Sequence, residues 1–428
     1  VPGLVHTAAG TGLLLWPGDR RIPQCLAGSA YVAAALAVPA GFLLGGPWAL
    51  ALLVLVLASY GVAGHAALQH EPLTPGVPAP AVTPGLMLKV ALDEGLLCYF
   101  TLSARVPTGE RARLMQIECE RIRAQYRDRD LRSFHREPIP PQNLQLRPRR
   151  LYGQDYQHLC FDSGYQPWED DPGAQAWQAQ ARNRRAHAWV LQHPGPPRPW
   201  LVCIHGYRMG MPVLDFLLFR PRWLHHRLGL NLLLPVLPLH GPRREGLRSG
   251  DGYLDGDFPN FIHAEAQAMH DIRSLIGWLR DAQQAPAVGA FGYSLGGYNT
   301  ALLSCLEDRL ECVIAGIPMT DIAATLWRHM PPLQLRYLES LGLTQEAARE
   351  ALRVISPLAI PPRTARRYVF AGTADRLIPP AQVLALARHW QLPEGPVWYP
   401  GTHLSFRREP AVSALILRAL RESGLITG

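Results

Sequence analysis

The fold of this 428-residue chain is decided by the stretch Ala290-Phe291-Gly292-Tyr293-Ser294-Leu295-Gly296-Gly297-Tyr298. An apolar run covers residues 285–291 and a helix-like run covers 298–306, so the sequence predicts a strand, a sharp turn and a helix. Gly292 and Gly296 flank Ser294 at the spacing of a nucleophile elbow, where small residues let the two backbones approach closely. The start of the helix offers N–H groups and a partial positive charge to a developing oxyanion. Taken alone, the pattern also suits a glycine-rich turn with an idle serine.

Two further side chains supply what a serine nucleophile needs, a base and a carboxylate that orients the base. Asp375 follows a predicted strand at 368–371, and His403 follows the next one at 397–399. The order Ser294, Asp375, His403 is the one expected when a serine triad lies on successive loops of one sheet. The sequence therefore predicts these three residues as nucleophile, acid and base.

Other residues compete for these roles. Asp321 follows the strand after the elbow and is the alternative acid, while His205 is expected to shape a loop rather than to act as base. His240, at the end of another strand, could line the pocket or only stabilise its own loop. His263 and His270 lie seven residues apart on one predicted helix, which spans two turns and makes a poor metal site. We expect neither a metal nor another cofactor.

The second half of the chain alternates predicted strands and helices. Strands are expected at 156–161, 186–191, 200–204, 230–237, 285–291, 312–317, 368–371 and 397–399, the first two as edge strands. Helices are expected at 261–280 and 411–421. Such alternation predicts an α/β fold, with a mostly parallel central sheet flanked by helices and with loops gathered at the strands' carboxyl ends.

With these motifs in place, the chain from about Tyr156 to its end resembles the α/β-hydrolase superfamily. The detail is most similar to the dienelactone-hydrolase and prolyl-oligopeptidase-type branches, in which a Ser-Pro pair like that at 356–357 precedes the acid strand. The resemblance implies an oxyanion hole formed by the backbone N–H groups of Leu295 and Tyr207, with Gly206 as a less favoured donor. The segment after His205 lacks the triple glycine of some esterases, so this motif does not decide which residue is the second oxyanion donor.

The N-terminal part carries a long uncharged segment. From Ile22 to His70 there is no Asp, Glu, Lys or Arg, and the apolar stretches 26–44 and 48–68 are each long enough to cross a bilayer. The Gly-Gly-Pro turn at 45–47 joins them, so we expect a hydrophobic helical hairpin at 1–75 that spans the membrane. A monotopic or re-entrant pair and a soluble buried hairpin are the alternatives. The chain opens at Val1 without methionine, so a preceding segment, with any targeting peptide, is expected to be missing.

A basic region follows the hairpin. Between Arg105 and Arg150 twelve arginines stand against six acidic residues, which suits contact with anionic headgroups as well as an ordinary solvated helix face. Arg20 and Lys89 flank the uncharged hairpin, so both ends and the catalytic domain are expected on the cytoplasmic side. We expect a basic helical linker region at 76–150, including a helix at 110–134 and a proline-bearing linker at 138–148, and a catalytic domain at 151–428.

Residues 319–362 exceed what a simple crossover needs and are expected to form a helical lid insertion, with a capped helix at 344–355. Its apolar side chains suggest a lipophilic ester substrate, although they could simply pack against the sheet. No nucleic-acid motif accompanies the formal charge of +8. The seven cysteines form no Cys-x-x-Cys motif, so we expect small core residues of a reducing compartment rather than disulfides.

Together these observations predict a membrane-associated serine hydrolase, a carboxylic-ester hydrolase that acts on a small-molecule ester through an acyl-enzyme. An acyltransferase or a peptidase would use the same triad and is the alternative enzyme. The alternative from another class is a non-catalytic, membrane-tethered binding module that has kept the fold.

Overall fold

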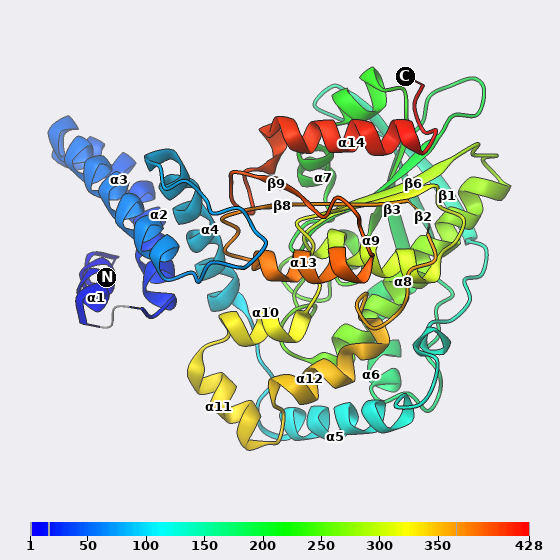
Figure 1. Ribbon diagram of the computed structural model, residues 1–428, viewed down its shortest axis with the longest axis horizontal. Helices are drawn as coiled ribbons and strands as arrows, with labels where there is room; N and C mark the ends of the chain where they lie inside the picture. Colours follow the sequence, from blue (N-terminus) through cyan, green and yellow to red (C-terminus); the bar gives the residue numbers. More distant parts are fainter. Residues whose placement is uncertain (1, 16–17, 365, 428) are drawn as a thin grey trace. The chain divides into compact units, whose positions relative to one another are not determined.

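The computed structural model describes residues 2–15, 18–364 and 366–427, which form two compact units. The first unit contains the chain up to Ser103 together with Ala371–Leu384 and Val397–Val412. The second contains Ala104–Phe370, Ala385–Pro396 and the chain from Ser413 onward. Figure 1 labels the α-helices and several of the strands of both units.

The second unit is built on a sheet with the strand order β1-β2-β3-β5-β4-β6-β7-β8. Its strands are β1 (Gln142–Leu151), β2 (Gln154–Asp162), β3 (Arg185–Leu191), β4 (Trp200–Ile204), β5 (Asn231–Val236), β6 (Val288–Tyr293), β7 (Cys312–Gly316) and β8 (Arg366–Gly372). The pairs β1/β2, β2/β3 and β3/β5 are antiparallel, and the remaining pairs from β5 to β8 are parallel. The predicted α/β fold with a mostly parallel sheet is confirmed.

Burial explains why the central strands are apolar throughout. Every residue of β4, β5, β6 and β7 is buried, as expected for parallel strands that are covered on both faces. In Figure 1, α8 (Phe258–Asp281) and α9 (Leu295–Leu306) lie against one face, and α7 (Pro212–Phe219) lies on the other. Apolar side chains along α8, including Ile262, Met269 and Leu279, are buried.

Shorter elements complete the second unit. They are α5 (Gly109–Gln125), η1 (Leu131–Phe134), α6 (Ala174–Gln178), η2 (Ala181–Arg184), η3 (Arg222–Arg227), η4 (Gly241–Arg243), α10 (Ile322–His329), α11 (Pro332–Ser340), α12 (Gln345–Ala351) and η5 (Leu352–Ile355). Helices α13 (Pro380–His389) and α14 (Pro410–Glu422) each begin in the first unit and end in the second. The insertion at 319–362 is helical, and Thr344 caps α12 by accepting a hydrogen bond from the N–H of Ala347 at 3.1 Å.

Several sequence predictions for the first strands and the segment before them are wrong. The proline-bearing linker expected at 138–148 is largely strand β1, which forms an edge of the sheet, so the stretch 156–161 is not an edge strand and neither is 186–191. Pro148 pairs with Gln157 in this edge strand, where a missing N–H is tolerated. The helix expected at 110–134 ends as α5 at Gln125, and residues 131–134 form a separate 3₁₀ turn that Asp130 caps.

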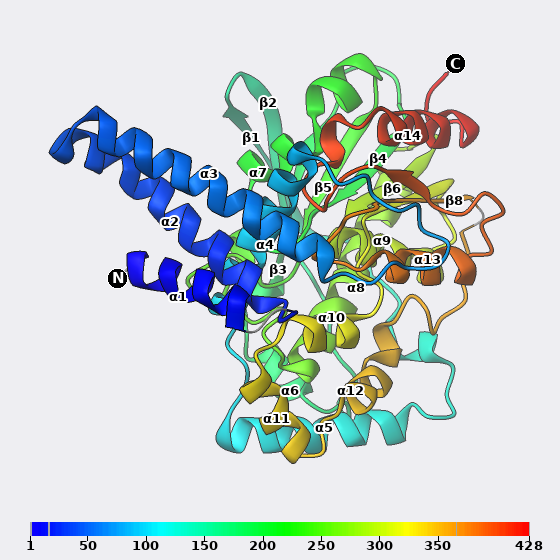
Figure 2. The ribbon, with the colours of Figure 1, turned by 60° about the vertical axis from the view of Figure 1, so that its left-hand side comes forward.

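The first unit contains four helices from the N-terminal part of the chain. These are α1 (Pro2–Leu15), α2 (Arg21–Leu44), α3 (Gly46–Gln69) and α4 (Pro84–Ser103). Only Gly45, at φ 93°, separates α2 from α3, and Tyr31 packs edge-on against Tyr60 with ring centroids 5.4 Å apart. Figure 2 shows α2 and α3 lying side by side, with α4 beside them.

Helices α2 and α3 are long and apolar enough to cross a membrane, and most of their side chains are not buried. The predicted helical hairpin is therefore present as a pair of packed helices. The first unit also contains β9 (Val397–Tyr399) and η6 (Phe406–Arg408). None of the seven cysteines is in a disulfide; Cys25 is exposed, Cys98 is half-buried and the other five are buried.

Candidate active site

Ser294 occupies a strained turn between β6 and α9. Its backbone has φ 56° and ψ −116°, and its side chain is half-buried. A positive φ is costly for any residue except glycine, so the surrounding contacts must hold the turn in place. One of these contacts is the hydrogen bond from the N–H of Ser294 to the carbonyl of Gly316 on β7, at 2.9 Å. The geometry is that of a strand, sharp turn and helix, with the serine at the apex.

The glycines of the elbow are required by close backbone approaches. A Cβ added to Gly296 would collide with the carbonyl oxygens of Ile204 and His205 at the end of β4. A Cβ on Gly292 would meet the backbone of Gly296 in the same way. Helix α9 can therefore start directly against the sheet only because both positions lack side chains.

The segment after β4 lies next to the elbow. A Cβ added to Gly206 would lie 3.8 Å from the Cβ of Ser294 and 3.5 Å from the carbonyl oxygen of Tyr293. Both residues predicted as oxyanion donors, Leu295 and Tyr207, thus adjoin the serine turn in the second unit, Leu295 as the first residue of α9 and Tyr207 directly after Gly206. Their roles as donors remain predictions.

His205 supports this segment through both nitrogens of its ring. Nδ1 donates to the carbonyl of Gly206 at 2.8 Å, and Nε2 accepts from the N–H of Leu237 at 3.1 Å. Burial lowers the pKa of His205 to about 4, so the ring is neutral near pH 7. The side chain therefore joins the segment after β4 to the end of β5, which agrees with the expected role of shaping this loop.

His240 belongs to a loop that is stabilised by its own polar contacts. Its ring is fully buried and Nδ1 donates to the carbonyl of Pro238 at 2.9 Å. The neighbouring Arg243 donates to the carbonyls of Val236 and Asn183, each at 3.0 Å, and forms a 2.8 Å ion pair with Asp271 on α8. Of the two predictions for His240, these contacts favour the loop-stabilising one.

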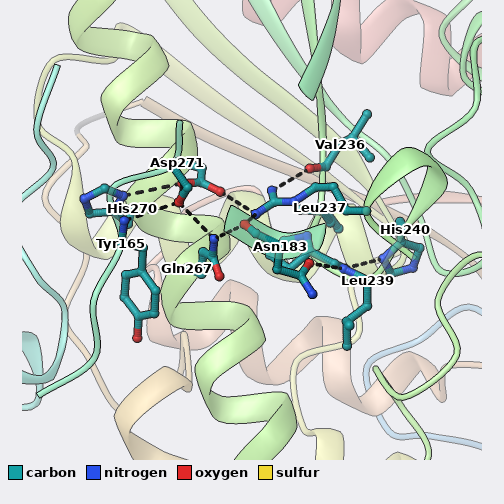
Figure 3. A network of polar contacts seen from close by, with 12 residues as sticks. Tyr165, Asn183, Val236, Leu237, Leu239, His240, Gln267, His270 and Asp271 are labelled. Carbon is teal, nitrogen blue, oxygen red and sulfur yellow. Dashed lines mark hydrogen bonds and ion pairs between the residues drawn. The ribbon is translucent and has the colours of Figure 1, made fainter. Parts of the chain in front are cut away.

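Figure 3 shows this buried network beside α8. Gln267 donates to the carbonyl of Asn183 at 2.7 Å, and the side chain of Asn183 accepts from the N–H of Leu239 at 2.8 Å. Asn183, Gln267 and Asp271 were not predicted from the sequence, since no motif marks them. For Gln267 and Asp271 the available signal was their place as polar residues within the predicted helix at 261–280, and Asn183 had none.

The predicted acid and base are in contact within the first unit. Nδ1 of His403 lies 2.7 Å from Oδ2 of Asp375, and both side chains are buried. The other carboxylate oxygen of Asp375 accepts from the N–H of Ile378 at 2.9 Å. Burial alone would lower the pKa of His403, but the charge and hydrogen bond of Asp375 raise it above its ordinary value. This arrangement can orient an imidazole and stabilise its positive charge.

A second carboxylate, Asp93 of α4, contacts the same histidine loop. It accepts hydrogen bonds from the N–H of His403 at 2.8 Å and from the Thr402 hydroxyl at 3.2 Å. Burial and the nearby charge of Asp375 raise the pKa of Asp93 to about 7, although His403 opposes that rise. The sequence did not predict this residue. Its only signal was an Asp-Glu pair within a largely apolar stretch whose one other charged residue is Lys89.

The rival acid Asp321 is engaged elsewhere. One carboxylate oxygen accepts from the N–H of Ala324 at 2.9 Å and so caps α10, and the other lies 3.1 Å from Nε of Arg349. His263 contacts the carbonyl of Pro172 at 2.8 Å, and His270 lies 3.5 Å from Asp271. Across the described ranges, no group of three His, Cys, Asp or Glu side chains could hold a metal ion.

Residues 265–400 match the Prolyl oligopeptidase family, a range that includes Ser294 and Asp375. Over 296 residues the chain is 40% identical to the uncharacterized protein Rv2627c of Mycobacterium tuberculosis strain H37Rv, covering 68% of this chain and 70% of that protein. The uncharacterized protein MT2702 of strain CDC 1551 matches equally.

Similar solved structures include two acetyl xylan esterases. For acetyl xylan esterase 1 from Thermoanaerobacterium sp. the identity is 17% and the TM-score is 0.47, covering 75% of this chain and 96% of that chain. For the enzyme from Paenibacillus sp. R4 the identity is 14% and the TM-score is 0.48, with the same coverage.

Proposed function

Because the chain belongs to the serine hydrolases of the prolyl-oligopeptidase-like branch of the α/β-hydrolases, we propose that it is a membrane-associated carboxylic-ester hydrolase. The observation that carries this proposal is the buried pair formed by His403 and Asp375, whose side chains lie 2.7 Å apart. The strained turn at Ser294 supports it, since such strain persists where it presents a nucleophile.

In the proposed mechanism, Oγ of Ser294 attacks the ester carbonyl while Nε2 of His403 removes the hydroxyl proton. The N–H groups of Leu295 and Tyr207 stabilise the oxyanion of the tetrahedral intermediate. Collapse of this intermediate breaks the bond to the alkoxy oxygen, and His403 returns the proton to the departing alcohol. Water then repeats the sequence on the acyl-enzyme and releases the carboxylic acid. Asp375 holds the imidazole in the tautomer that both steps require.

Membrane association is the second part of the proposal. Apolar side chains of α2 and α3 are widely exposed, including Phe42, Leu50 and Leu57, which is costly in water and favourable in lipid. Neither helix contains a charged side chain after Arg21. The arginine-rich region at 105–150 would meet anionic headgroups, with the catalytic residues on the cytoplasmic side.

The substrate class is inferred from the insertion at 319–362. Leu333 of α11 is largely exposed, and Trp327 of α10 stacks on Phe258 with ring centroids 6.2 Å apart. Apolar side chains on a helical insertion would suit a lid over a lipophilic acyl group. A peptidase is the second candidate, because the family matched by residues 265–400 takes its name from a peptidase.

Labelling with a fluorophosphonate and turnover of p-nitrophenyl esters of increasing chain length test this proposal. We expect Ser294 to carry the adduct and Ser294→Ala to lose ester turnover while keeping the thermal transition of the wild type. Ser133→Ala, which alters an exposed serine, is the matched control. Absence of an adduct under native conditions would favour the binding module. Cleavage of peptide substrates with no ester turnover would favour the peptidase.

A further inference from the structure

Two adjacent acidic residues of α4 are fully buried. Asp93 and Glu94 both have an exposed fraction of 0%. Burying a carboxylate is costly unless hydrogen bonds or an opposite charge compensate for it, so a consecutive pair within an apolar helix requires a specific reason. Each carboxylate has its own partner loop in the first unit, and these two loops carry the proposed base and acid.

Asp93 binds the loop of His403 through three consecutive residues. Oδ2 accepts from the N–H of His403 at 2.8 Å, while Oδ1 accepts from the Thr402 hydroxyl at 3.2 Å and from the N–H of Leu404 at 3.4 Å. Two of these donors are backbone groups of the histidine itself and of the residue after it. Asp93 therefore constrains the backbone from which the imidazole projects.

Glu94 binds the loop of the proposed acid. Its Oε1 accepts from Nε of Arg376 at 2.9 Å, and Arg376 is the residue directly after Asp375. Arg376 also forms an ion pair with Glu71, just beyond α3. The guanidinium is only 3% exposed, so the two acidic partners compensate a buried charge.

We propose that α4 is part of the active site, with Asp93 and Glu94 as positioning residues that fix the histidine loop and the acid loop relative to each other. This inference rests on the proposed function. One helix turn holds both loops, because the two carboxylates are neighbours in sequence and emerge from the same segment of α4. The helix that does so packs on both helices of the apolar hairpin.

The side chain of Asp93 also acts on the charge of the base. The titratable groups facing it are His403 and Asp375 from the two loops and Tyr31 from α2. Burial lowers the pKa of His403, whereas Asp375 first and Asp93 next raise it. Asp93 carries its charge above its pKa of about 7 and there raises the pKa of His403. Because the proposed base must be neutral to accept a proton, Asp93→Asn should move the acid limb of the kcat/KM profile to lower pH.

The experiment compares Asp93→Asn with wild type in the full-length protein, using a short-chain p-nitrophenyl ester across pH 5–9. Asparagine keeps one acceptor oxygen and turns an NH₂ group toward a donor. We expect kcat to fall about ten- to hundredfold, a part of what a positioned base contributes, with KM nearly unchanged. The acid limb should shift to lower pH. Asp155→Asn, at a carboxylate that is 79% exposed, is the matched control and should leave both unchanged.

A kcat and an acid limb equal to those of wild type would overturn the inference, and so would a fall in kcat without movement of the limb. Should Asp93→Asn fail to fold, Thr402→Val removes one donor to Asp93 and decides the matter. We expect a loss in kcat of about fivefold, and an unchanged kcat would reject the positioning role. Failure of the proposed function is distinguished separately, because Ser294→Ala would then retain ester turnover.

Discussion

The backbone of Ser294 stores strain that its neighbours must offset. A non-glycine residue at φ 56° costs about 1–3 kcal/mol, and the closeness of β4, β6 and α9 holds the turn. That closeness depends on Gly296, whose missing side chain leaves space only for the carbonyl oxygens at the end of β4. The close packing at Gly296 therefore holds the strained backbone of Ser294 in place.

Replacement of Gly296 by alanine should disrupt the elbow. The new methyl group would overlap the carbonyl oxygens of Ile204 and His205, so β4 and α9 must separate. We expect a clear fall in the thermal transition temperature and loss of fluorophosphonate labelling. Gly61→Ala is the matched control, since a Cβ at that helical position meets nothing within 4 Å. Equal behaviour of the two variants would contradict the steric argument.

The buried ion pair in Figure 3 leads to a second prediction at the residue scale. Asp271→Asn would leave the guanidinium of Arg243, which is 1% exposed, without its compensating charge. Removing one partner of such a pair costs about 3–5 kcal/mol in free energy of unfolding. Asp155→Asn, at an exposed ion pair with Arg150, should cost about 0–1 kcal/mol. Urea denaturation at pH 7 measures both values.

The pH dependence of the same pair has a definite sign. Burial would raise the pKa of Asp271, but the charge of Arg243 and the hydrogen bonds from His270 and Ser163 lower it below the ordinary 3.8. A depressed folded-state pKa stabilises the protein above the unfolded-state pKa, and this stability is lost as the pH falls through the folded value. The difference between wild type and Asp271→Asn should therefore shrink below about pH 4. A difference that grows toward acid would contradict the ion-pair assignment.

Sequence motifs pointed to only part of the candidate site. Ser294, Asp375 and His403 could be predicted because each follows a strand within a short local pattern. Asp93 could not, since it lies 310 residues before the histidine whose N–H it accepts and no local pattern links them. Contacts at that separation depend on the packing of α4, which the residues around Asp93 do not encode by themselves.

At the scale of elements, periodicity predicted the central strands well and the first one poorly. Strands β4 and β9 have the predicted bounds, because continuous apolar runs bounded by polar residues are distinctive. Strand β1 was missed because it contains Pro148 and three arginines, lies next to a proline-rich stretch and has mostly exposed residues. An edge strand needs only one hydrogen-bonded neighbour, so it tolerates a composition that elsewhere indicates a loop.

Two threonines test helix capping in the second unit. Thr344 precedes α12 and accepts from the N–H of Ala347, whereas Thr108 precedes α5 without a side-chain cap hydrogen bond. Thr344→Ala should lower the free energy of unfolding by about 1 kcal/mol. Thr108→Ala should change it by only a few tenths, because no capping bond is lost. Urea denaturation of both variants measures the contrast, and equal losses would show that the bond contributes nothing.

At the scale of the whole molecule, the first unit draws its residues from three separate stretches of the chain. The loops of Asp375 and His403 are grouped with helices α1 to α4, while Ser294 belongs to the second unit. Composition cannot predict such a grouping, because it depends on contacts such as Asp93 with His403 rather than on local residue content. Among the N-terminal helices, α4 is thus part of the proposed active site, and α2 and α3 form the proposed membrane contact.

Membrane association can be tested on the intact chain by carbonate extraction. If α2 and α3 cross the bilayer, the wild type stays in the pellet, since spanning helices resist extraction. Leu53→Asp with Leu57→Asp places two charges near the middle of α3, where each costs about 2.5–3.5 kcal/mol. We expect a marked shift of this double variant to the supernatant.

The matched control introduces the same charges on the second unit. Leu247 and Tyr152 are largely exposed, so Leu247→Asp with Tyr152→Asp should leave the protein in the pellet. Release of the wild type by carbonate would contradict spanning helices. Release of both double variants would mean that added charge lowers binding in general, and that α3 has no special part in it. Retention of the Leu53→Asp, Leu57→Asp protein in the pellet, as for the wild type, would also contradict a position of α3 across the bilayer centre. Two carboxylates at that depth would cost too much free energy for the protein to stay inserted.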